Sequence, residues 1–454
     1  MHRANEVLLL AFMIFFMCLP VASAGTAGYF SQDWAPYHAY YIIYPGAVDV
    51  VGQTAYFGSH YTGPHLTNFL YAVNITDGRL IWRYNTTLPI NFVSNFTYDG
   101  STYIIVGTGD PTVLQSQGGY VLAFYPQKNM TFWPTESNLG ASVQSLGTAV
   151  SNPSNNEDVI AGLANGQVVR LSGNNGSIQW RYNCAGNITT GNVPNIVQLD
   201  NGSVAVGTLD GIRGHVYCIE QNGSLAWSYT STALRLVTKL GSLNCVVAAS
   251  TDVIDVRNGT TGKEITPWPF NTTRVIPPFS VSQDVTDVLC TQDYTGDHFP
   301  DIVVSTDGNN GGFLMIIDGS NAALLRGPVK VSSYTLSDVQ YMYSYENGTP
   351  LLNRTLAISI GTSSTSFYVC GVNASDLTVM KEFPVPGIFA ATNLVNIENS
   401  TNFAGNVLFS AGNSVYCISG TEIVSEFPLQ ITLIIVPTLW ISIIILKRYR
   451  PRIK

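Results

Sequence analysis

Short apolar segments that end in small residues recur along most of the chain. The first is Thr54–Gly58 and the last is Asn406–Ser410. A second apolar segment of four residues follows each of them, from Leu70–Val73 in the first unit to Val415–Ile418 in the last. Segments this short, separated by polar and glycine-containing turns, are typical of β-strands. The pattern therefore predicts eight repeated units, each with at least two strands.

Tryptophans mark a further strand in several of these units. Trp82, Trp133, Trp180 and Trp227 are spaced by 51, 47 and 47 residues, and Trp268 follows after 41. Three of the tryptophans stand four residues after a glycine and two residues before a tyrosine, as in Gly78–Tyr84, Gly176–Tyr182 and Gly223–Tyr229. Each such segment alternates apolar and polar residues, which predicts a strand after a turn.

These units predict a single all-β domain over residues 25–426, because no helical period and no long linker interrupts them. Eight units of short strands are typical of an eight-bladed β-propeller with four-stranded blades. A seven-bladed propeller is the alternative if one unit is irregular, and residues 257–300 are the least regular stretch. A solenoid would leave end strands that need caps, which makes it the weaker interpretation.

The tryptophan frame resembles the repeat of the PQQ-like (pyrroloquinoline-quinone) β-propeller family, Ala-X-Asp-X-X-Thr-Gly-X-X-X-Trp. The first unit matches it at Ala72, Gly78 and Trp82, with Asn74 in place of Asp and Asp77 in place of Thr. The last three units have no such Trp. The resemblance implies that each Trp packs against the neighbouring blade, where a large flat side chain buries much area.

The two ends of the chain predict a secreted, anchored protein. Residues 1–24 have the basic start, apolar run and small-residue end of a signal peptide. Residues 427–446 are uncharged, long enough for a transmembrane helix, and followed by the basic tail 447–454. Positive charge stays on the cytoplasmic side, so we expect a single-pass type I cell-membrane protein with residues 25–426 outside the cytoplasm. The outer strand of the last blade is expected at Thr421–Phe427, directly before the membrane.

The anchor segment, from Glu426 through Pro437 to the basic end, resembles C-terminal surface-anchoring segments of archaeal proteins, which implies an archaeal cell envelope. Between the signal peptide and the tail lie 28 acidic and 15 basic residues, a balance that argues against nucleic-acid binding. Sequons for N-glycosylation occur at 14 asparagines. They are Asn74, Asn85, Asn95, Asn129, Asn175, Asn187, Asn201, Asn222, Asn258, Asn271, Asn347, Asn353, Asn373 and Asn399.

Six cysteines follow the signal peptide, and two interpretations of them stay open. An even number in an oxidising compartment allows three disulfides, whereas buried strand positions allow free thiols. The residues are Cys184, Cys218, Cys245, Cys290, Cys370 and Cys417.

One acidic loop predicts a metal site. Asp293, Thr295, Asp297 and Asp301 place oxygen-bearing side chains at positions 1, 3, 5 and 9, and the carbonyl of Phe299 adds a ligand at position 7. A set of oxygen ligands alone suits Ca²⁺. The loop resembles the integrin-type (FG-GAP-like) calcium repeat, from which it departs by Thr295 and by His298 where Gly is usual. The resemblance implies one structural Ca²⁺ site, and we expect both departures to weaken Ca²⁺ binding.

The chain shows no HExxH, GxSxG, Walker A or GxGxxG motif. Quinoprotein dehydrogenases share the resembled fold, but they carry an adjacent Cys-Cys pair that this sequence lacks. We therefore expect a non-catalytic propeller that binds a surface protein or a glycan in the envelope, with no catalytic or cofactor-binding residues. The alternative is a quinoprotein-like dehydrogenase that uses PQQ and Ca²⁺ in the central funnel.

Overall fold

The computed structural model describes residues 28–419, except 30, 33–34, 40–41, 61–67, 111–117, 135–136, 152–155, 189–194, 212, 277–282, 291, 309–310, 334, 347–348, 364–365, 387–391, 398–405. The expected signal peptide, transmembrane helix and basic tail lie outside these residues. No helix within this range has the length and apolar character needed to cross a bilayer.

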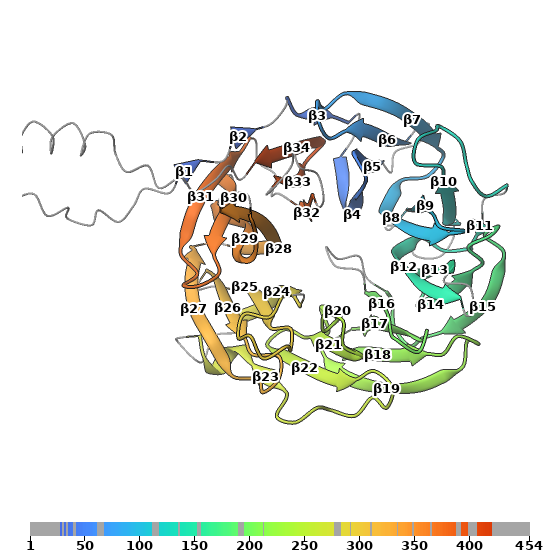
Figure 1. The fold of residues 1–454 in the computed structure, drawn as a ribbon. Coiled ribbons are helices and arrows are strands. Elements are labelled where there is room, and N and C mark those ends of the chain that lie inside the picture. The colour runs from blue at the N-terminus through green and yellow to red at the C-terminus, as the bar shows by residue number, and fades with distance from the viewer. Residues whose placement is uncertain are drawn as a thin grey trace, which may run out of the picture. The chain divides into compact units, whose positions relative to one another are not determined.

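In the described residues eight sheets follow one another around a ring (Figure 1), six of four strands and two of five, so the eight-bladed prediction is confirmed. Blade one holds β4 (Ile42–Val51), β5 (Thr54–His60), β6 (Asn68–Asn74) and β7 (Leu80–Thr86). Blade two holds β8 (Ile90–Tyr98), β9 (Ser101–Thr108), β10 (Tyr120–Phe124) and β11 (Ser137–Asn138). Blade three holds β12 (Val143–Ser151), β13 (Asn156–Leu163), β14 (Gln167–Leu171) and β15 (Ile178–Asn183). Blade four holds β16 (Ile196–Gln198), β17 (Val204–Asp210), β18 (Arg213–Ile219) and β19 (Leu225–Thr232).

The second half of the ring repeats this arrangement. Blade five holds β20 (Leu236–Lys239), β21 (Cys245–Ala249), β22 (Val253–Asn258) and β23 (Phe270–Asn271), followed by the 3-10 helix η1 (Thr272–Arg274). Blade six holds β24 (Gln283–Leu289), β25 (Ile302–Gly308), β26 (Gly312–Ile317) and β27 (Leu324–Ser332). Blade seven holds β28 (Thr335–Glu346), β29 (Thr349–Ser363), β30 (Ser366–Asn373) and β31 (Val379–Val385). Blade eight holds β32 (Thr392–Asn396), β33 (Asn406–Ala411) and β34 (Ser414–Ser419).

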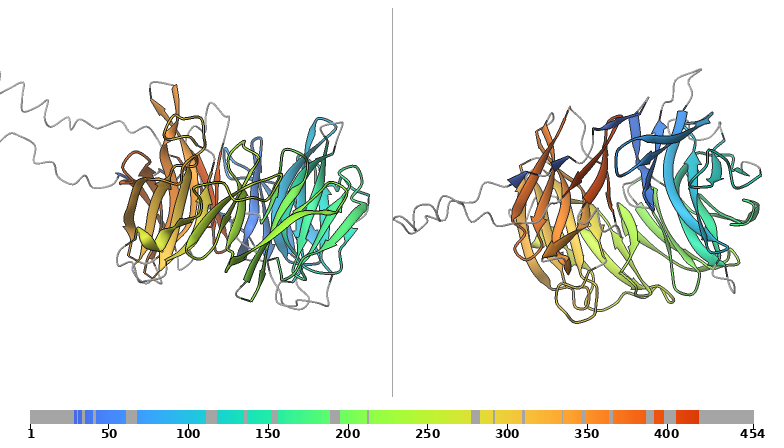
Figure 2. Two further views of the ribbon diagram at one scale, coloured as in Figure 1. Left: turned by 90° about the horizontal axis from the view of Figure 1, so that it is seen from below. Right: turned by 45° about the horizontal axis from the view of Figure 1, so that its top comes forward.

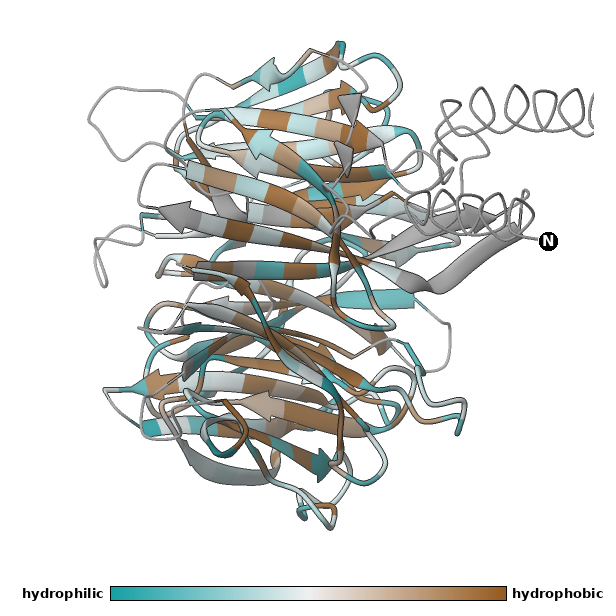
Figure 3. Cartoon of the chain, turned by 90° about the vertical axis from the view of Figure 1, so that its left-hand side faces the viewer, coloured by the Kyte–Doolittle hydropathy of each residue, from teal (hydrophilic) through white to brown (hydrophobic). Residues whose placement is uncertain are grey.

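The second and third strands of each blade are apolar along their length because neighbouring blades cover both of their faces. Side views of the ring show the sheets standing face to face (Figure 2). In β9, for example, the last six of eight residues are buried. The outer strand has one solvated face, and β15 accordingly alternates between exposed and half-buried residues. Figure 3 shows the resulting bands of hydrophobic and hydrophilic residues along the strands.

Blades one to four each carry a tryptophan that contacts the next blade. Their indole Nε1 donates to a backbone carbonyl in a turn of the following blade, at 2.9–3.1 Å. The pairs are Trp82 with Pro126, Trp133 with Gly173, Trp180 with Gln221, and Trp227 with Gly259. The predicted structural role of these side chains is thereby confirmed. Trp268 is buried as well, but its Nε1 has no hydrogen-bond partner among the described residues.

Strands from the start of the chain complete the last two blades. β2 (Ser31–Gln32) and β3 (Tyr37–His38) pair antiparallel with β34, and β1 (Gly28–Tyr29) pairs parallel with β31. The expected outer strand Thr421–Phe427 lies outside the described residues. A strand has two edges, and β34 has β33 on one edge and the N-terminal strands on the other.

All six cysteines are free thiols in this structure, so the second interpretation holds. Cys218, Cys290, Cys370 and Cys417 are buried, and Cys184 and Cys245 are partly buried. Burial raises the pKa of the Cys184 thiol to about 12, which keeps it protonated and unreactive at neutral pH.

Candidate functional site

A groove of about 680 Å³ lies between blades one and two. Its walls are the β4–β5 turn, the start of β9 and the turn after β10. The lining residues are Val51, Gly52, Gln53, Thr54, Tyr56, Ser101, Thr102, Tyr103, Tyr125, Pro126, Gln127 and Lys128. Tyrosines, amides and hydroxyls dominate this lining, and Lys128 is its one charged residue.

The floor of the groove is held in place by hydrogen bonds to one carbonyl. Tyr56 Oη donates to the Pro126 oxygen at 2.7 Å, and Trp82 Nε1 donates to the same oxygen at 3.1 Å. Burial raises the pKa of Tyr56 to about 12, so its hydroxyl stays protonated and keeps donating. The groove is therefore built on the same contact that joins blade one to blade two.

Aromatic rings form one wall. Tyr103 stacks on Phe132 with ring centroids 3.8 Å apart, and Tyr125 meets both rings edge to face. Lys128 Nζ lies 5.4 Å from the centre of the Tyr125 ring. A rigid aromatic wall beside exposed amides such as Gln53 and Gln127 suits the binding of a ligand rather than the catalysis of a reaction.

The sequence interpretation missed this groove. A signal was present, since Tyr56 and Tyr103 occupy the third position of β5 and β9, where blade three has Asp158. The contact of these strands with the turn 125–128 depends on how the two blades pack, which the spacing does not reveal.

The predicted metal loop lies between β24 and β25, and its residues fold around the carboxylate of Asp293. Asp293 Oδ1 accepts hydrogen bonds from Thr295 N, Thr295 Oγ1 and Gly296 N, and Oδ2 accepts from His298 N at 2.8 Å. His298 has a φ of +74°, in the left-handed region where glycine is usual.

Asp301 anchors the other end of the loop. It is fully buried and accepts hydrogen bonds from the backbone N–H groups of Tyr294, Thr295 and Gly319. Burial raises the pKa of Asp301 despite these bonds. Asp297 is exposed, and its hydrogen bond from Phe299 N lowers its pKa.

The loop thus brings Asp293, Thr295 and Asp301 together, and Asp297 bonds to Phe299 N and to the side chains of Thr295 and Ser320. Within the part of the chain that the structure describes, no three His, Cys, Asp or Glu side chains meet as a metal site requires. Calcium binding by this loop stays a prediction.

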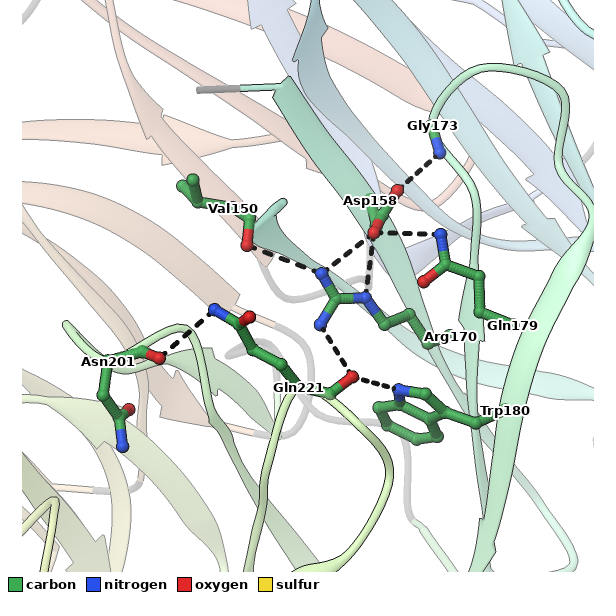
Figure 4. A network of polar contacts seen from close by, with 8 residues as sticks. All are labelled: Val150, Asp158, Arg170, Gly173, Gln179, Trp180, Asn201 and Gln221. Atoms are coloured by element: carbon green, nitrogen blue, oxygen red, sulfur yellow. Dashed lines mark hydrogen bonds and ion pairs between the residues drawn. The ribbon is translucent and has the colours of Figure 1, made fainter. Parts of the chain in front are cut away.

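A buried ion pair within blade three also contacts blade four (Figure 4). Arg170 Nε donates to Asp158 Oδ2 at 2.9 Å, and both side chains are about 95% buried. Asp158 also accepts from Gly173 N and Gln179 Nε2, while Arg170 reaches the carbonyl of Gln221 that Trp180 binds. Every donor and acceptor described here has a partner within the fold, so the cluster acts as a clamp between blades.

Two buried carboxyl groups form a similar link between blades six, seven and eight. Asp287 Oδ2 accepts from Val339 N, and Asp338 Oδ2 accepts from Leu394 N, each at 3.0 Å. The two side chains also hydrogen bond to each other, which requires a proton on one of them. Burial and the neighbouring Asp338 carboxyl raise the pKa of Asp287 well above its ordinary value.

Comparison with known proteins supports the resemblance found in the sequence. Residues 52–266 match a PQQ-repeat family model described as outer membrane protein assembly factor BamB. This match spans just under half of the chain and covers blade one without β4, blades two to four and part of blade five. Together with the eight-bladed ring, it supports the PQQ-like propeller family. No curated protein sequence matches the chain.

Two solved structures with low sequence identity share the fold, and a third superposes less well. Sqt1 of Chaetomium thermophilum, solved with the N-terminus of the ribosomal protein L10, superposes with a TM-score of 0.61 at 14% identity, over 86% of this chain and 100% of Sqt1. The computationally designed Ika8 protein superposes with a TM-score of 0.58 at 12% sequence identity, over 86% of this chain and 99% of Ika8. BamB from Moraxella catarrhalis superposes with a TM-score of 0.49 at 14% sequence identity, over 85% of this chain and 98% of BamB.

Proposed function

We propose that the chain is a non-catalytic binding propeller, held on the outside of the cell membrane, whose groove between blades one and two takes up a segment of a surface protein. The groove is the observation that carries this proposal, because it is preformed, lined by tyrosines and neutral polar groups, and about the size of known ligand sites.

The comparisons point in the same direction. The matched family is named for an assembly factor, and the Sqt1 propeller was solved with the N-terminal segment of another protein. Tyr125 is half-buried and has surface left for a bound segment, and a tyrosine buries a large area at a small cost in side-chain entropy. Lys128 favours a segment with an acidic side chain. It is the one charged residue of the groove lining, and it is positive in a chain whose acidic residues outnumber its basic residues.

A photo-crosslinking experiment tests the groove. A photoreactive amino acid replaces Gln127 in the full chain, and the control variant carries it at Ser228, which is exposed on β19 of blade four. We expect one defined protein partner to crosslink at position 127 and none at 228. Tyr125→Ala in the first variant should abolish the crosslink. Equal labelling at both positions, or capture of glycans alone, would refute a protein-binding groove.

The quinoprotein alternative has no observation in its favour among the residues that the structure describes. Titration of the purified protein with PQQ, with and without Ca²⁺, checks it directly. Retention of the quinone together with dye reduction would replace the binding proposal by an enzymatic one. The extracytoplasmic location is part of our proposal, and protease treatment of intact cells tests it by digestion of residues 25–426.

A further inference from the structure

Several sequons occupy the same place in successive blades, the turn between the third and the fourth strand. Asn74, Asn175, Asn222 and Asn258 lie in the β6–β7, β14–β15, β18–β19 and β22–β23 turns. In each, the side-chain Oδ1 accepts a hydrogen bond from the backbone N–H two residues later, at 2.7–3.0 Å. This bond shapes the turn and explains why an asparagine recurs there.

These turns share one face of the propeller. In an antiparallel blade, the turn from the first to the second strand and the turn from the third to the fourth lie at the same end of the sheet. The Gln221 Nε2 to Asn201 oxygen bond of 3.2 Å joins two such turns in blade four. Five sequon asparagines on this face are exposed, namely Asn129, Asn175, Asn201, Asn222 and Asn258.

The turn and a glycan use different atoms of the same amide. The hydrogen bonds described above engage the oxygen, whereas N-glycosylation takes place at the nitrogen Nδ2. In Asn222 the oxygen also accepts from Ser224 Oγ at 2.7 Å, so the sequon hydroxyl lies beside the amide in the folded turn.

Asn95 differs from these five residues in its position in the blade, in its exposure and in the contact of its amide nitrogen. It lies within β8 and is half-buried, and its Nδ2 donates to Asp49 Oδ2 of blade one at 2.8 Å. A glycan on this nitrogen would break the bond and would have to fit between two packed blades. A chain modified there is not expected to reach the folded state.

We infer that the exposed asparagines of this face, Asn129, Asn175, Asn201, Asn222 and Asn258, carry N-linked glycans, whereas Asn95 does not. The inference rests on the extracytoplasmic location proposed above. The sugar comes from a lipid-phosphate-linked oligosaccharide. A bond forms between Nδ2 and sugar C1, the bond from C1 to the phosphate oxygen breaks, the lipid phosphate leaves, and the amide loses one N–H proton.

Site mapping tests the inference on the full chain, expressed in a eukaryotic secretory host. Enzymatic deglycosylation in ¹⁸O-water converts each modified asparagine to ¹⁸O-labelled aspartate, which peptide mass spectrometry locates. We expect the label at the five exposed positions and none at Asn95. Asn165 is a control without a sequon, since it is exposed and makes the same bond to Gln167 N.

Two variants separate the turn from the modification. Asn222→Asp keeps an oxygen acceptor for the Ser224 N–H but removes the acceptor nitrogen, and Ser224→Ala keeps the asparagine but removes the sequon. Both should lose the mass of one glycan, and Asn222→Asp should keep the melting temperature of the deglycosylated parent. No label at the five positions, or a label at Asn95 equal to theirs, would overturn the inference.

Protease treatment of the same cells tells the two proposals apart. An unlabelled chain that external protease digests would refute the glycans and leave the extracytoplasmic location standing. An unlabelled chain that is protected from protease would refute both.

Discussion

A comparison of two tryptophans separates the effect of the indole hydrogen bond on stability from the effect of side-chain packing. Trp133 and Trp268 are equally buried, but only Trp133 donates its Nε1 proton, to the Gly173 oxygen. We expect Trp133→Phe to lower the free energy of unfolding by about 1–2 kcal/mol more than Trp268→Phe, because it leaves a buried carbonyl without its donor. Urea unfolding of both variants measures the difference. Equal losses would show that packing alone determines the effect.

The resemblance of the tryptophan frame to the PQQ-like repeat implied the role of these residues, and it agrees with the large area that a flat side chain can bury. It could not predict that Trp268 lacks a partner. That outcome depends on the turn that blade six presents, and the irregular spacing of 41 residues before Trp268 was the one visible sign.

The predicted binding of Ca²⁺ by the loop 293–301 can be tested at single carboxylates. If the loop binds Ca²⁺, the melting temperature should rise on addition of CaCl₂ and fall on addition of EDTA. Asp297→Ala should abolish that dependence, because Asp297 is the one exposed carboxylate of the proposed ligand set. Asp376→Ala is the control, since Asp376 makes the corresponding local bond to Thr378 N in blade seven. Identical melting in CaCl₂ and EDTA would contradict the prediction.

Between elements, the clamp of blades three and four should be far stronger than a surface ion pair. Arg170→Met leaves the buried Asp158 charge without its partner, which we expect to cost about 3–5 kcal/mol of unfolding free energy. The matched change Arg79→Met breaks an exposed pair with Asp77 and should cost about 0–1 kcal/mol. Urea unfolding compares them. A similar loss in both would mean that Asp158 finds another cation or a proton.

The carboxyl pair between blades six and seven predicts a dependence of stability on pH. Unfolded Asp287 loses its proton near pH ~4, but burial and Asp338 keep it protonated to a higher pH in the folded state. The unfolded chain therefore binds fewer protons in that window, and stability falls as pH rises from about 4 to the raised pKa.

The substitution Asp287→Asn imitates the protonated carboxyl, since an amide at this position can accept from Val339 N and donate to Asp338. We therefore expect Asp287→Asn to flatten the fall and to stabilise the protein at neutral pH, as measured by urea unfolding between about pH 4 and 8. Asp284→Asn, on the same strand but half-exposed and paired with Arg235, serves as the control. Parallel profiles of wild type and Asp287→Asn would refute the shared proton.

At the scale of elements, the sequence predicted the strands that are buried on both faces and missed contacts between blades. Segments such as Tyr103–Gly107 are continuous apolar runs because two blades cover them, and that pattern is local. The pairing of Asp287 with Asp338, and the contact of Arg170 with the Gln221 carbonyl, depend on how neighbouring blades pack. No periodicity along the chain records it.

Described residues between Gly28 and His38, near the start of the chain, take part in closing the ring. They supply a fifth strand to blade seven and the outer strands of blade eight. Tyr37 extends the link to blade one, with its ring 5.5 Å from Phe57 and 5.6 Å from Tyr71. The N- and C-terminal parts of the propeller are therefore joined by strand pairing and aromatic contacts.

Deletion of residues 28–38 should open the ring at this point while the other blades keep their own pairing. We expect faster amide hydrogen exchange in β34 and β31, because each loses the hydrogen-bond partner on its outer edge, with little change in β13 and β17 on the far side. The milder Tyr37→Ala should loosen the contact of blade one with the N-terminal segment and leave β31 protected. Exchange that rises uniformly around the ring would show that closure stabilises all blades as one cooperative unit.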